Sequence, residues 1–155
     1  SDSDQIDELV PRWDPQSGQV VALCPTDPSE AQRQFCFYDP ATMGRQAGAD
    51  IDQHLFDYQV APDGSRVLGL DINHQATSDE DRLEFRLFDW SGKSGALLAG
   101  TAQVDRFAQS PDGSHFAYLH AETSEMHLVD IATGQEPFSP GQRAAGRITW
   151  LGWIQ

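Results

Sequence analysis

Ser110-Pro111-Asp112-Gly113-Ser114 stands directly before the apolar run Phe116 to Leu119. The same phrase occurs as Ala61-Pro62-Asp63-Gly64-Ser65 before Val67 to Leu70, and in weaker form as Asp14-Pro15-Gln16-Ser17-Gly18 before Val20 to Leu23. Proline presets the first corner of a tight turn, and glycine adopts the backbone conformation that other residues resist. Because the three prolines are 47 and 49 residues apart, the sequence predicts an internal structural repeat.

The composition is typical of one compact domain with a hydrophobic core, since 39% of the 155 residues are hydrophobic and 22% are charged. No apolar run approaches the ~18 residues of a membrane span, and no signal peptide is visible. The first residue is Ser1 rather than Met, which indicates a processed or truncated N-terminus. The net charge of −14, with Lys93 as the only lysine, argues against nucleic acid as a partner.

Each repeat unit contains short apolar segments that alternate with turn residues. Residues 1–8 are a polar, acidic lead-in for which we expect flexibility, and residues 9–155 form a single β domain. We expect units at 9–54, 55–102 and 103–146, and a terminal strand of a fourth unit within 147–155. The expected strands are 9–13, 19–24, 34–39 and 42–46, then 55–60, 66–72, 83–90 and 96–99, then 104–108, 115–121, 125–131 and 135–138, and last 147–153.

Counting from the repeat landmarks places three pairs of side chains on equivalent cross-strand positions. Nine residues after each proline lie Cys24, Asp71 and His120, and three residues before Asp39, Asp89 and Asp130 lie Cys36, Arg86 and His127. The pairs are then Cys24 with Cys36, Asp71 with Arg86, and His120 with His127, each a chemically sensible cross-strand couple. We therefore predict a Cys24–Cys36 disulfide and, with it, an oxidising compartment.

Units of about 45 residues with four strands are typical of propeller blades, whose middle strands are buried on both faces. The continuous apolar runs Val20 to Leu23 and Phe116 to Leu119 fit such strands. We expect an all-β fold of three four-stranded antiparallel blades plus one strand of a fourth. The alternative is a β-sandwich built from the same strands.

The third unit resembles the TolB-like propeller repeat. Its phrase from Ser110 to Leu119 and the later stretch Glu125 to Gly134 follow the pattern of that repeat, "SPDG", an apolar run, then an apolar segment ending in Asp-x-x-Thr-Gly. Residues 61–92 match less closely, and residues 13–44 match in outline. The family includes periplasmic TolB, the propeller domains of prolyl oligopeptidase-like enzymes, and sensor or surface-protein domains, so the resemblance implies a fold rather than one function. Closed propellers have at least four blades, so three units and one strand leave the ring incomplete.

Few residues match a known pattern for metal binding, phosphate binding or catalysis. His120 and His127, with Glu122 and Glu125 nearby, form a partial ligand set for zinc, but no third ligand is nominated, and we expect a polar pair without metal. The acidic loop Ser78 to Asp81 lacks the pattern of an EF-hand and is interpreted as a solvated hairpin tip. Ser91-Gly92-Lys93-Ser94-Gly95 lacks the spacing of a phosphate-binding loop. No nucleophile signature is present. Trp150 occupies the repeat position of Trp13 and is expected in the core. For Trp153, both core packing and contact with a partner remain alternatives.

These features favour a protein–protein interaction or scaffold module without catalytic activity or cofactor. We expect an accessory subunit, or a soluble domain of a larger extracytoplasmic or membrane-associated assembly, that is periplasmic or secreted. It binds a protein partner or associates with itself, with no direct membrane insertion. One alternative is the propeller fragment or accessory domain of a hydrolase or peptidase. Another is a ligand or metal sensor that uses His120 and His127.

Overall fold

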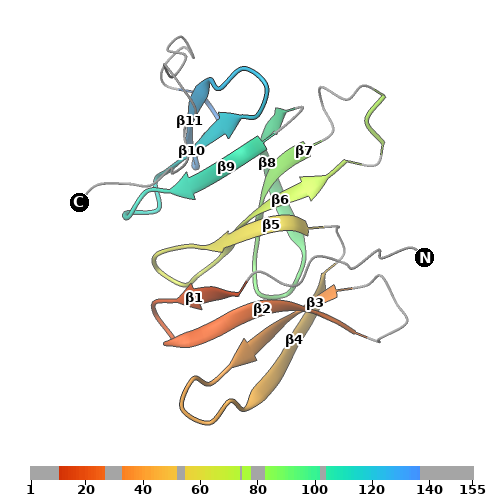
Figure 1. The fold of residues 1–155 in the computed structure, drawn as a ribbon, viewed down its shortest axis with the longest axis vertical. Coiled ribbons are helices and arrows are strands. Elements are labelled where there is room, and N and C mark those ends of the chain that lie inside the picture. The colour runs from red at the N-terminus through yellow and green to blue at the C-terminus, as the bar shows by residue number, and fades with distance from the viewer. Residues whose placement is uncertain are drawn as a thin grey trace.

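The computed structural model describes residues 11–26, 33–51, 55–73, 75–77, 83–101 and 104–136. In these ranges the chain forms three antiparallel sheets, each made by one repeat unit. The sheets stack along the long axis of the molecule, with the first sheet at one end and the third at the other (Figure 1). The described residues include no helix of the length and hydropathy that crossing a membrane requires.

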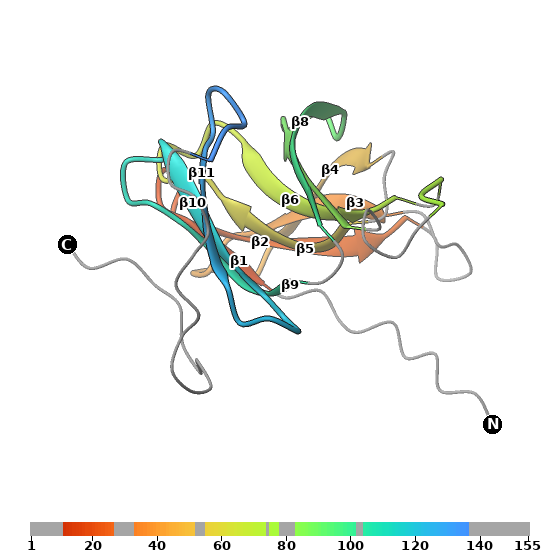
Figure 2. The same ribbon diagram turned by 90° about the horizontal axis from the view of Figure 1, so that it is seen from above.

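The strands follow the chain order within each sheet. The first sheet contains β1 (Arg12–Asp14), β2 (Gln19–Pro25), β3 (Arg33–Tyr38) and β4 (Arg45–Ile51). The second contains β5 (Leu55–Val60), β6 (Val67–Ile72), β7 (Leu83–Phe88) and β8 (Ser94–Thr101). The third contains β9 (Val104–Gln109), β10 (His115–His120) and β11 (Met126–Asp130). Seen from above, β10 and β11 run at a steep angle to β2 and β3 of the first sheet (Figure 2).

Each proline turn joins the first two strands of its sheet, as the repeat predicted. The amide of Gly64 donates to the carbonyl of Ala61, and the amide of Gly113 donates to that of Ser110. Both glycines have positive φ, the conformation for which glycine is favoured. The first turn is one residue longer, with the amide of Gly18 bonded to the carbonyl of Asp14.

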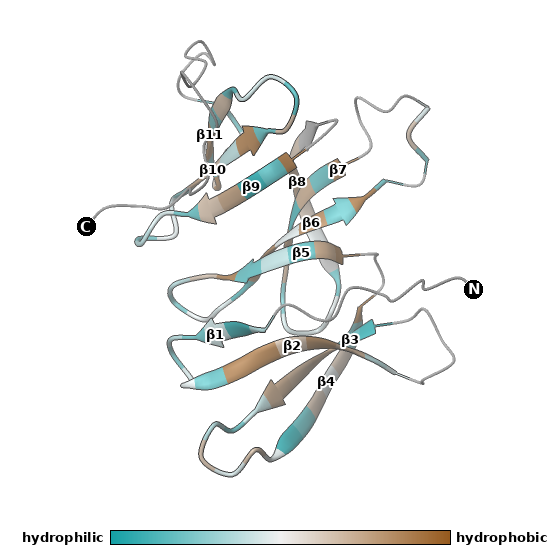
Figure 3. Cartoon of the chain, viewed as in Figure 1, coloured by the Kyte–Doolittle hydropathy of each residue, from teal (hydrophilic) through white to brown (hydrophobic). Residues whose placement is uncertain are grey.

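Two separate cores lie between the sheets. The first and second sheets enclose Val21, Leu23, Phe35, Ile51, Tyr58, Val67 and Phe88. The second and third enclose Leu68, Leu70, Phe85, Leu98, Phe107, Phe116, Tyr118, Val129 and Ile131. The second strand of each sheet (β2, β6 or β10) contains the longest run of buried residues in its sheet, and most of β2 is brown in Figure 3. Three sheets with two cores are a stack of blades, not the two sheets and single core of the sandwich alternative.

Most strands form where the sequence predicted them, including 96–99 within β8, but the fourth strands of the first and third units differ from the prediction. The strand predicted at 42–46 starts too early, because β4 begins at Arg45. The side chain of Asp39 accepts bonds from the amides of Ala41 and Thr42, and Met43 has a positive φ, so the chain is still turning there. In the third unit Gln135 and Glu136 are not in a strand. The remainder of that predicted strand, the terminal strand at 147–153 and the lead-in at 1–8 lie outside the described residues.

Candidate functional site

The first strands of neighbouring sheets are linked by a side chain at one repeat position, three residues before the turn proline. In the first sheet this residue is Arg12, whose Nε donates to the carbonyl of Tyr58 at 2.8 Å and whose Nη2 lies 2.8 Å from Asp57 Oδ1. In the second sheet it is Gln59, whose Nε2 donates to the carbonyl of Phe107 at 2.8 Å. Tyr58 and Phe107 also share a repeat position, so the same link is built twice.

Turn glycines bring the backbones of neighbouring sheets close together. A Cβ on Gly64 would lie 2.8 Å from Asp14 Oδ1 of the preceding turn. A Cβ on Gly92 would lie 1.9 Å from the carbonyl oxygen of Asp50 on β4, and one on Gly134 would lie 3.0 Å from that of Leu98 on β8. Each unit therefore uses its turns to seat itself on the unit before it.

The first sheet has the same positions, but no sheet precedes it in the described part of the chain. We call the side of the first sheet that faces away from the second sheet its outward face. A Cβ on Gly18 would meet no atom within 4 Å. Trp13, on the edge strand β1, is 56% exposed. This face is the candidate functional site, because its counterparts in the second and third sheets are both contact surfaces.

The predicted disulfide lies on the outward face. Cys24 and Cys36 are bonded, with their Cα atoms 6.0 Å apart, and both side chains are buried. Arg45 Nε donates to Cys36 Sγ at 3.3 Å, and the hydroxyl of Tyr38 lies 3.4 Å from Cys24 Sγ. The disulfide joins the two central strands of the first sheet at its uncovered side.

The predicted cross-strand positions are wrong by the same offset in each unit. The Cα partner of Cys24 is Gln34, that of Asp71 is Glu84, and the amide of His120 bonds to the carbonyl of Glu125. Each partner that the sequence predicted lies two residues further along the opposite strand. The predicted pairs are therefore diagonal neighbours on one face of the sheet. A diagonal still allows the disulfide, since side chains at i and j±2 are within reach of each other.

The offset changes the chemistry of the other two pairs. Arg86 forms its ion pair with Glu84, at 2.8 Å, and not with the predicted Asp71, whose side chain is buried. His127 stacks on Tyr118, and its Nδ1 lies 3.1 Å from Glu136 Oε1. His120 Nδ1 instead accepts from the amide of Glu122 at 3.3 Å. The described residues contain no group of three or more His, Cys, Asp or Glu side chains placed to hold a metal.

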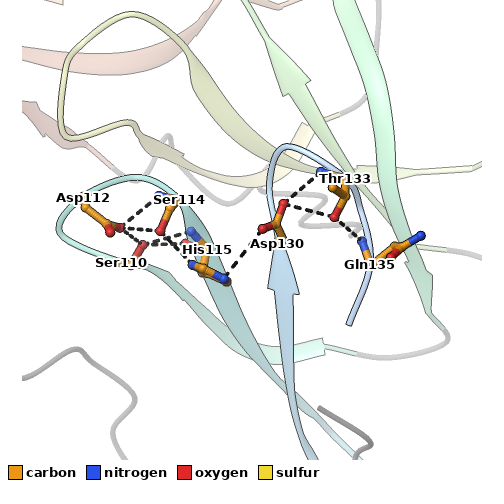
Figure 4. Close-up of polar contacts among 7 residues, drawn as sticks. All are labelled: Ser110, Asp112, Ser114, His115, Asp130, Thr133 and Gln135. Atoms are coloured by element: carbon orange, nitrogen blue, oxygen red, sulfur yellow. Dashed lines mark hydrogen bonds and ion pairs between the residues drawn. The ribbon is translucent and has the colours of Figure 1, made fainter. Parts of the chain in front are cut away.

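A serine, a histidine and an aspartate that the sequence reasoning did not connect lie together at the third turn (Figure 4). Ser114 Oγ lies 2.7 Å from His115 Nδ1, and His115 Nε2 lies 3.8 Å from Asp130 Oδ2. Ser114 Oγ also donates to Asp112 Oδ1 at 2.7 Å. A carboxylate only accepts, so the serine proton is committed to Asp112 and His115 donates to the serine. His115 therefore does not act as a base toward this serine, and the cluster holds the turn.

Hydrogen bonds within the turns stabilise the ionised form of three aspartates. Hydrogen bonds from the side chain of Ser110 and from the amide and hydroxyl of Ser114 hold the pKa of Asp112 well below its usual range. Hydrogen bonds from the side chain and amide of Ser65 also lower the pKa of Asp63. Asp130 also has a lowered pKa, chiefly because the amide of Thr133 donates to it. Asx-type turns explain these shifts without a catalytic role.

The remaining sequence candidates have no assigned chemistry. Lys93 follows Gly92 in the turn between β7 and β8, as expected for a β-turn rather than a phosphate loop. The acidic loop at 78–81, Trp150 and Trp153 lie outside the described residues. The links made by Arg12 and Gln59 were not predicted. The sequence did contain a signal for these links: a long side chain with a hydrogen-bond donor occupies the same repeat position in two successive units.

Comparison with known proteins supports the fold alone. No family model matches the chain, and no curated protein sequence matches it. Among solved structures, the chain is similar to an acylaminoacyl peptidase in complex with Z-Gly-Gly-Phe-chloromethyl ketone, with a TM-score of 0.56 and 11% sequence identity. The match covers 86% of this chain but only 25% of the peptidase chain, which has a β-propeller domain. The fold is all-β and propeller-like. The chain spans about a quarter of the length of this peptidase.

Proposed function

We propose that the protein is a non-catalytic interaction module that binds another protein through the outward face of its first sheet. The observation that carries this proposal is the contrast between equivalent faces. Val67 and Phe88 on the second sheet, and Phe116 on the third, are at most 1% exposed because the preceding sheet covers them. Val20 and Tyr38, their counterparts on the uncovered first sheet, are only half-buried, and Trp13 beside them is 56% exposed.

The size of the uncovered side chain supports this use. An exposed tryptophan leaves a large apolar surface in water, and its burial by a partner is favourable by roughly 25 cal/mol per Å² of apolar area. Tryptophan is also among the residues that dominate the energetics of protein interfaces. The stack thus has one end that is chemically suited to a protein contact.

The disulfide supports an extracytoplasmic setting. Disulfides persist in oxidising compartments such as the periplasm or the extracellular space, and are rare in the cytosol. The resemblance of Ser110 to Gly134 to the TolB-like repeat agrees with this setting, because that family includes periplasmic members. Within it, we propose an accessory subunit or soluble domain of a larger, membrane-associated assembly.

The test is a comparison of tagged baits in the organism that encodes the protein. Wild type, Trp13→Glu and Met126→Glu would be isolated without reducing agent, and the retained proteins would be quantified by mass spectrometry. Met126 is 52% exposed but lies in the third sheet, at the other end of the stack, and so serves as the matched control. We expect a partner that wild type and Met126→Glu retain and Trp13→Glu loses. Equal retention by all three baits would overturn the proposal.

A second candidate function comes from the structural comparison. The similar structure is a peptidase, and this chain matches about a quarter of it. The second candidate is therefore that the chain is the propeller part of a peptidase, a fold analogy that does not by itself assign an activity. Assay of the full gene product with acylated peptides decides this candidate, because a product without peptide hydrolysis eliminates it.

A further inference from the structure

The third sheet ends on a strand, β11, that has a neighbour on one side only in the part of the chain that the structure describes. This sheet has three strands in the order β11-β10-β9, whereas the first and second sheets have four each (Figure 1). The ladder between β10 and β11 is regular, without the register shifts found where β4 and β8 pair at the edges of the other sheets. A regular edge strand offers its backbone amides and carbonyls to any extended chain beside it.

The backbone groups on the open edge of β11 follow from one hydrogen bond. The amide of His120 donates to the carbonyl of Glu125, so these residues are a bonded pair in the register of β10 with β11. Bonded and non-bonded pairs alternate along an antiparallel ladder, so the odd-numbered residues of β11 bond to β10. The even-numbered residues Met126 and Leu128 therefore direct their amides and carbonyls to the open edge.

The turn after β11 closes in the same way as the turn that leads into β4. The amide of Asp39 donates to the carbonyl of Gly44 in the first sheet, and the amide of Asp130 donates to the carbonyl of Gln135 in the third. The amide and hydroxyl of Thr133 donate to the side chain of Asp130 and hold the turn (Figure 4). The amide of Asp130 thus faces the same edge as those of the other even-numbered residues, as the alternation requires.

The sequence after this turn is poorly suited to continue along β11. In the first sheet, Gln46 of β4 is paired with Phe37 of β3, two residues beyond the pair that the turn closes. At the equivalent positions the third unit has Pro137 and Leu128. Proline has no amide hydrogen and is unable to donate to the carbonyl of Leu128. The edge is therefore left to a strand from another source.

The charge around this edge favours a basic partner over a second copy of the chain. Residues 110–136 contain no lysine or arginine and five acidic residues, Asp112, Glu122, Glu125, Asp130 and Glu136. The whole unit at 103–146 has six acidic residues and two arginines, so it is acidic as well. Two copies that paired β11 with β11 would bring these acids together, and like charges repel. Lysine or arginine side chains on an added strand would be attracted to the same edge.

The side chains of β11 indicate how the residues of the added strand alternate. Met126, which is 52% exposed, and Leu128, which is half-buried, lie on one face of the sheet because they are two residues apart. His127 lies on the other face, where its Nδ1 is 3.1 Å from Glu136 Oε1. An added strand therefore meets apolar side chains on one face and an acidic one on the other.

We infer that β11 binds an extended, basic segment of a partner protein, which adds to the third sheet as its fourth strand. Apolar residues of the segment lie beside Met126 and Leu128, and the alternate lysine or arginine residues face Glu136. Backbone hydrogen bonds supply the affinity and the alternating side chains supply the specificity, as in other cases of strand addition. This surface belongs to the third sheet, so the inference goes beyond the proposed function of the first.

Peptide binding to the isotope-labelled chain, followed by NMR, tests the added strand. The probe is a short blocked peptide of alternating lysine and valine, and its control is a peptide of alternating glutamate and valine. We expect the lysine peptide to protect the amide of Leu128 from hydrogen exchange, and the glutamate peptide to leave it unprotected. Trp13→Glu should bind the lysine peptide as wild type does, because Trp13 lies in the first sheet at the other end of the stack.

Two proline variants and one charge variant locate the contact. Leu128→Pro removes an amide that faces the open edge but no bond to β10, and is expected to weaken peptide binding at least about 10-fold. Ala47→Pro is the matched control, because Ala47 is an exposed residue of the edge strand β4. Glu136→Gln changes no backbone group and should weaken binding about threefold at low salt. Circular dichroism spectra that match wild type show that the variants are folded.

Three results would overturn the inference. If the amide of Leu128 is protected before any peptide is added, the chain's own residues occupy the edge. If the chain self-associates and Leu128→Pro abolishes this, the partner is a second copy. If both peptides bind equally, or Ala47→Pro weakens binding as much as Leu128→Pro, the basic strand at β11 is refuted. The proposed function survives all three, and only baits that retain the same proteins regardless of Trp13 refute it.

Discussion

The two junctions of the stack use the same repeat positions with different chemistry. At the first junction, between the first and second sheets, Arg12 donates to the carbonyl of Tyr58 and pairs with Asp57. At the second junction, Gln59 donates to the carbonyl of Phe107, and its Oε1 accepts from the amide of Gln109. The first link is ionic and includes a tyrosine, whereas the second is neutral. The geometry therefore belongs to the repeat, and the chemistry is free to vary from one junction to the next.

The cores of the junctions differ as well. Phe35 contacts the rings of Tyr58 and Trp90 at the first junction. Phe85, at the same repeat position, contacts the rings of Phe107, Phe116 and Tyr118 at the second. Both junctions rely on aromatic packing, which Phe37 and Trp90 extend at the first, and the first adds a charged link. Four experiments separate these contributions.

The largest effect is expected from removing the central ring of each core. Phe35→Ala and Phe85→Ala each leave a cavity at a fully buried site, which costs about 3–5 kcal/mol of the free energy of unfolding. We expect Phe85→Ala to be the more costly, because Phe85 makes three ring contacts. Urea unfolding measures both. Equal costs would mean that aromatic packing does not distinguish the junctions.

The next largest effect concerns the turn glycines. Gly92→Ala combines a positive φ with a Cβ 1.9 Å from the carbonyl oxygen of Asp50, so the first junction must move apart, at a cost of about 3 kcal/mol. Gly134→Ala, with 3.0 Å to Leu98, is expected to cost about 1–2 kcal/mol, mainly from φ. Gly18→Ala is the control for φ alone, because nothing lies within 4 Å. If thermal unfolding showed the same loss of stability for Gly18→Ala and Gly92→Ala, the close approach of Gly92 to Asp50 would be contradicted.

High pH is expected to weaken the first junction through Tyr58. Burial, opposed in part by Arg12, raises the pKa of Tyr58 well above its usual range, and its hydroxyl donates to the carbonyl of Val21. The unfolded tyrosine ionises near pH 10, so the stability that Tyr58 contributes is complete below about pH 10 and falls as the pH rises toward the folded pKa.

Urea unfolding at increasing pH reads this out. Tyr58→Phe should lose less stability than wild type above about pH 10. Phe107→Leu, the matched change at the second junction, should keep the wild-type dependence on pH. If Tyr58→Phe also kept the wild-type dependence on pH, the loss of stability at high pH would arise elsewhere in the chain.

The smallest effect is that of salt. Arg12→Gln removes the pair with Asp57, whose side chain, like that of Arg12, is 31% exposed, so the cost at low salt is about 0.5–1 kcal/mol. Salt screens exposed charges, and at about 1 M the difference from wild type should shrink. The cost of Gln59→Ala should not change with salt, because that link is neutral. A salt-dependent Gln59→Ala would remove the distinction between the junctions.

The sequence predicted the strands well because their signals are local. The start of each second strand is indicated by the turn at Pro15, Pro62 or Pro111 and by the apolar run that follows it. β5 forms with the predicted bounds. The strand predicted at 42–46 forms later, as β4, for a physical reason: the turn after Asp39 is held by side-chain bonds and a positive φ at Met43, which periodicity does not report.

The candidate site was harder to predict. The positions of Cys24 and Cys36 were counted from landmarks on either side of a loop, and the register of a hairpin depends on that loop. The pairing was therefore displaced by two residues, although the disulfide itself was predicted correctly. The outward face could not be predicted from Trp13 alone, because the packing of neighbouring sheets decides which side of a strand is covered.

The position of the disulfide has a consequence for how the molecule opens. In a linear array each unit is held only by its neighbours, so the terminal units fray first. Cys24 and Cys36, 12 residues apart, clamp the terminal sheet that carries Trp13, and a crosslink of this span stabilises by about 3 kcal/mol. Fraying is therefore biased toward the opposite end, at β11. Reduction of this one bond would remove that bias, so the end of the molecule that we propose for binding would no longer be protected from fraying.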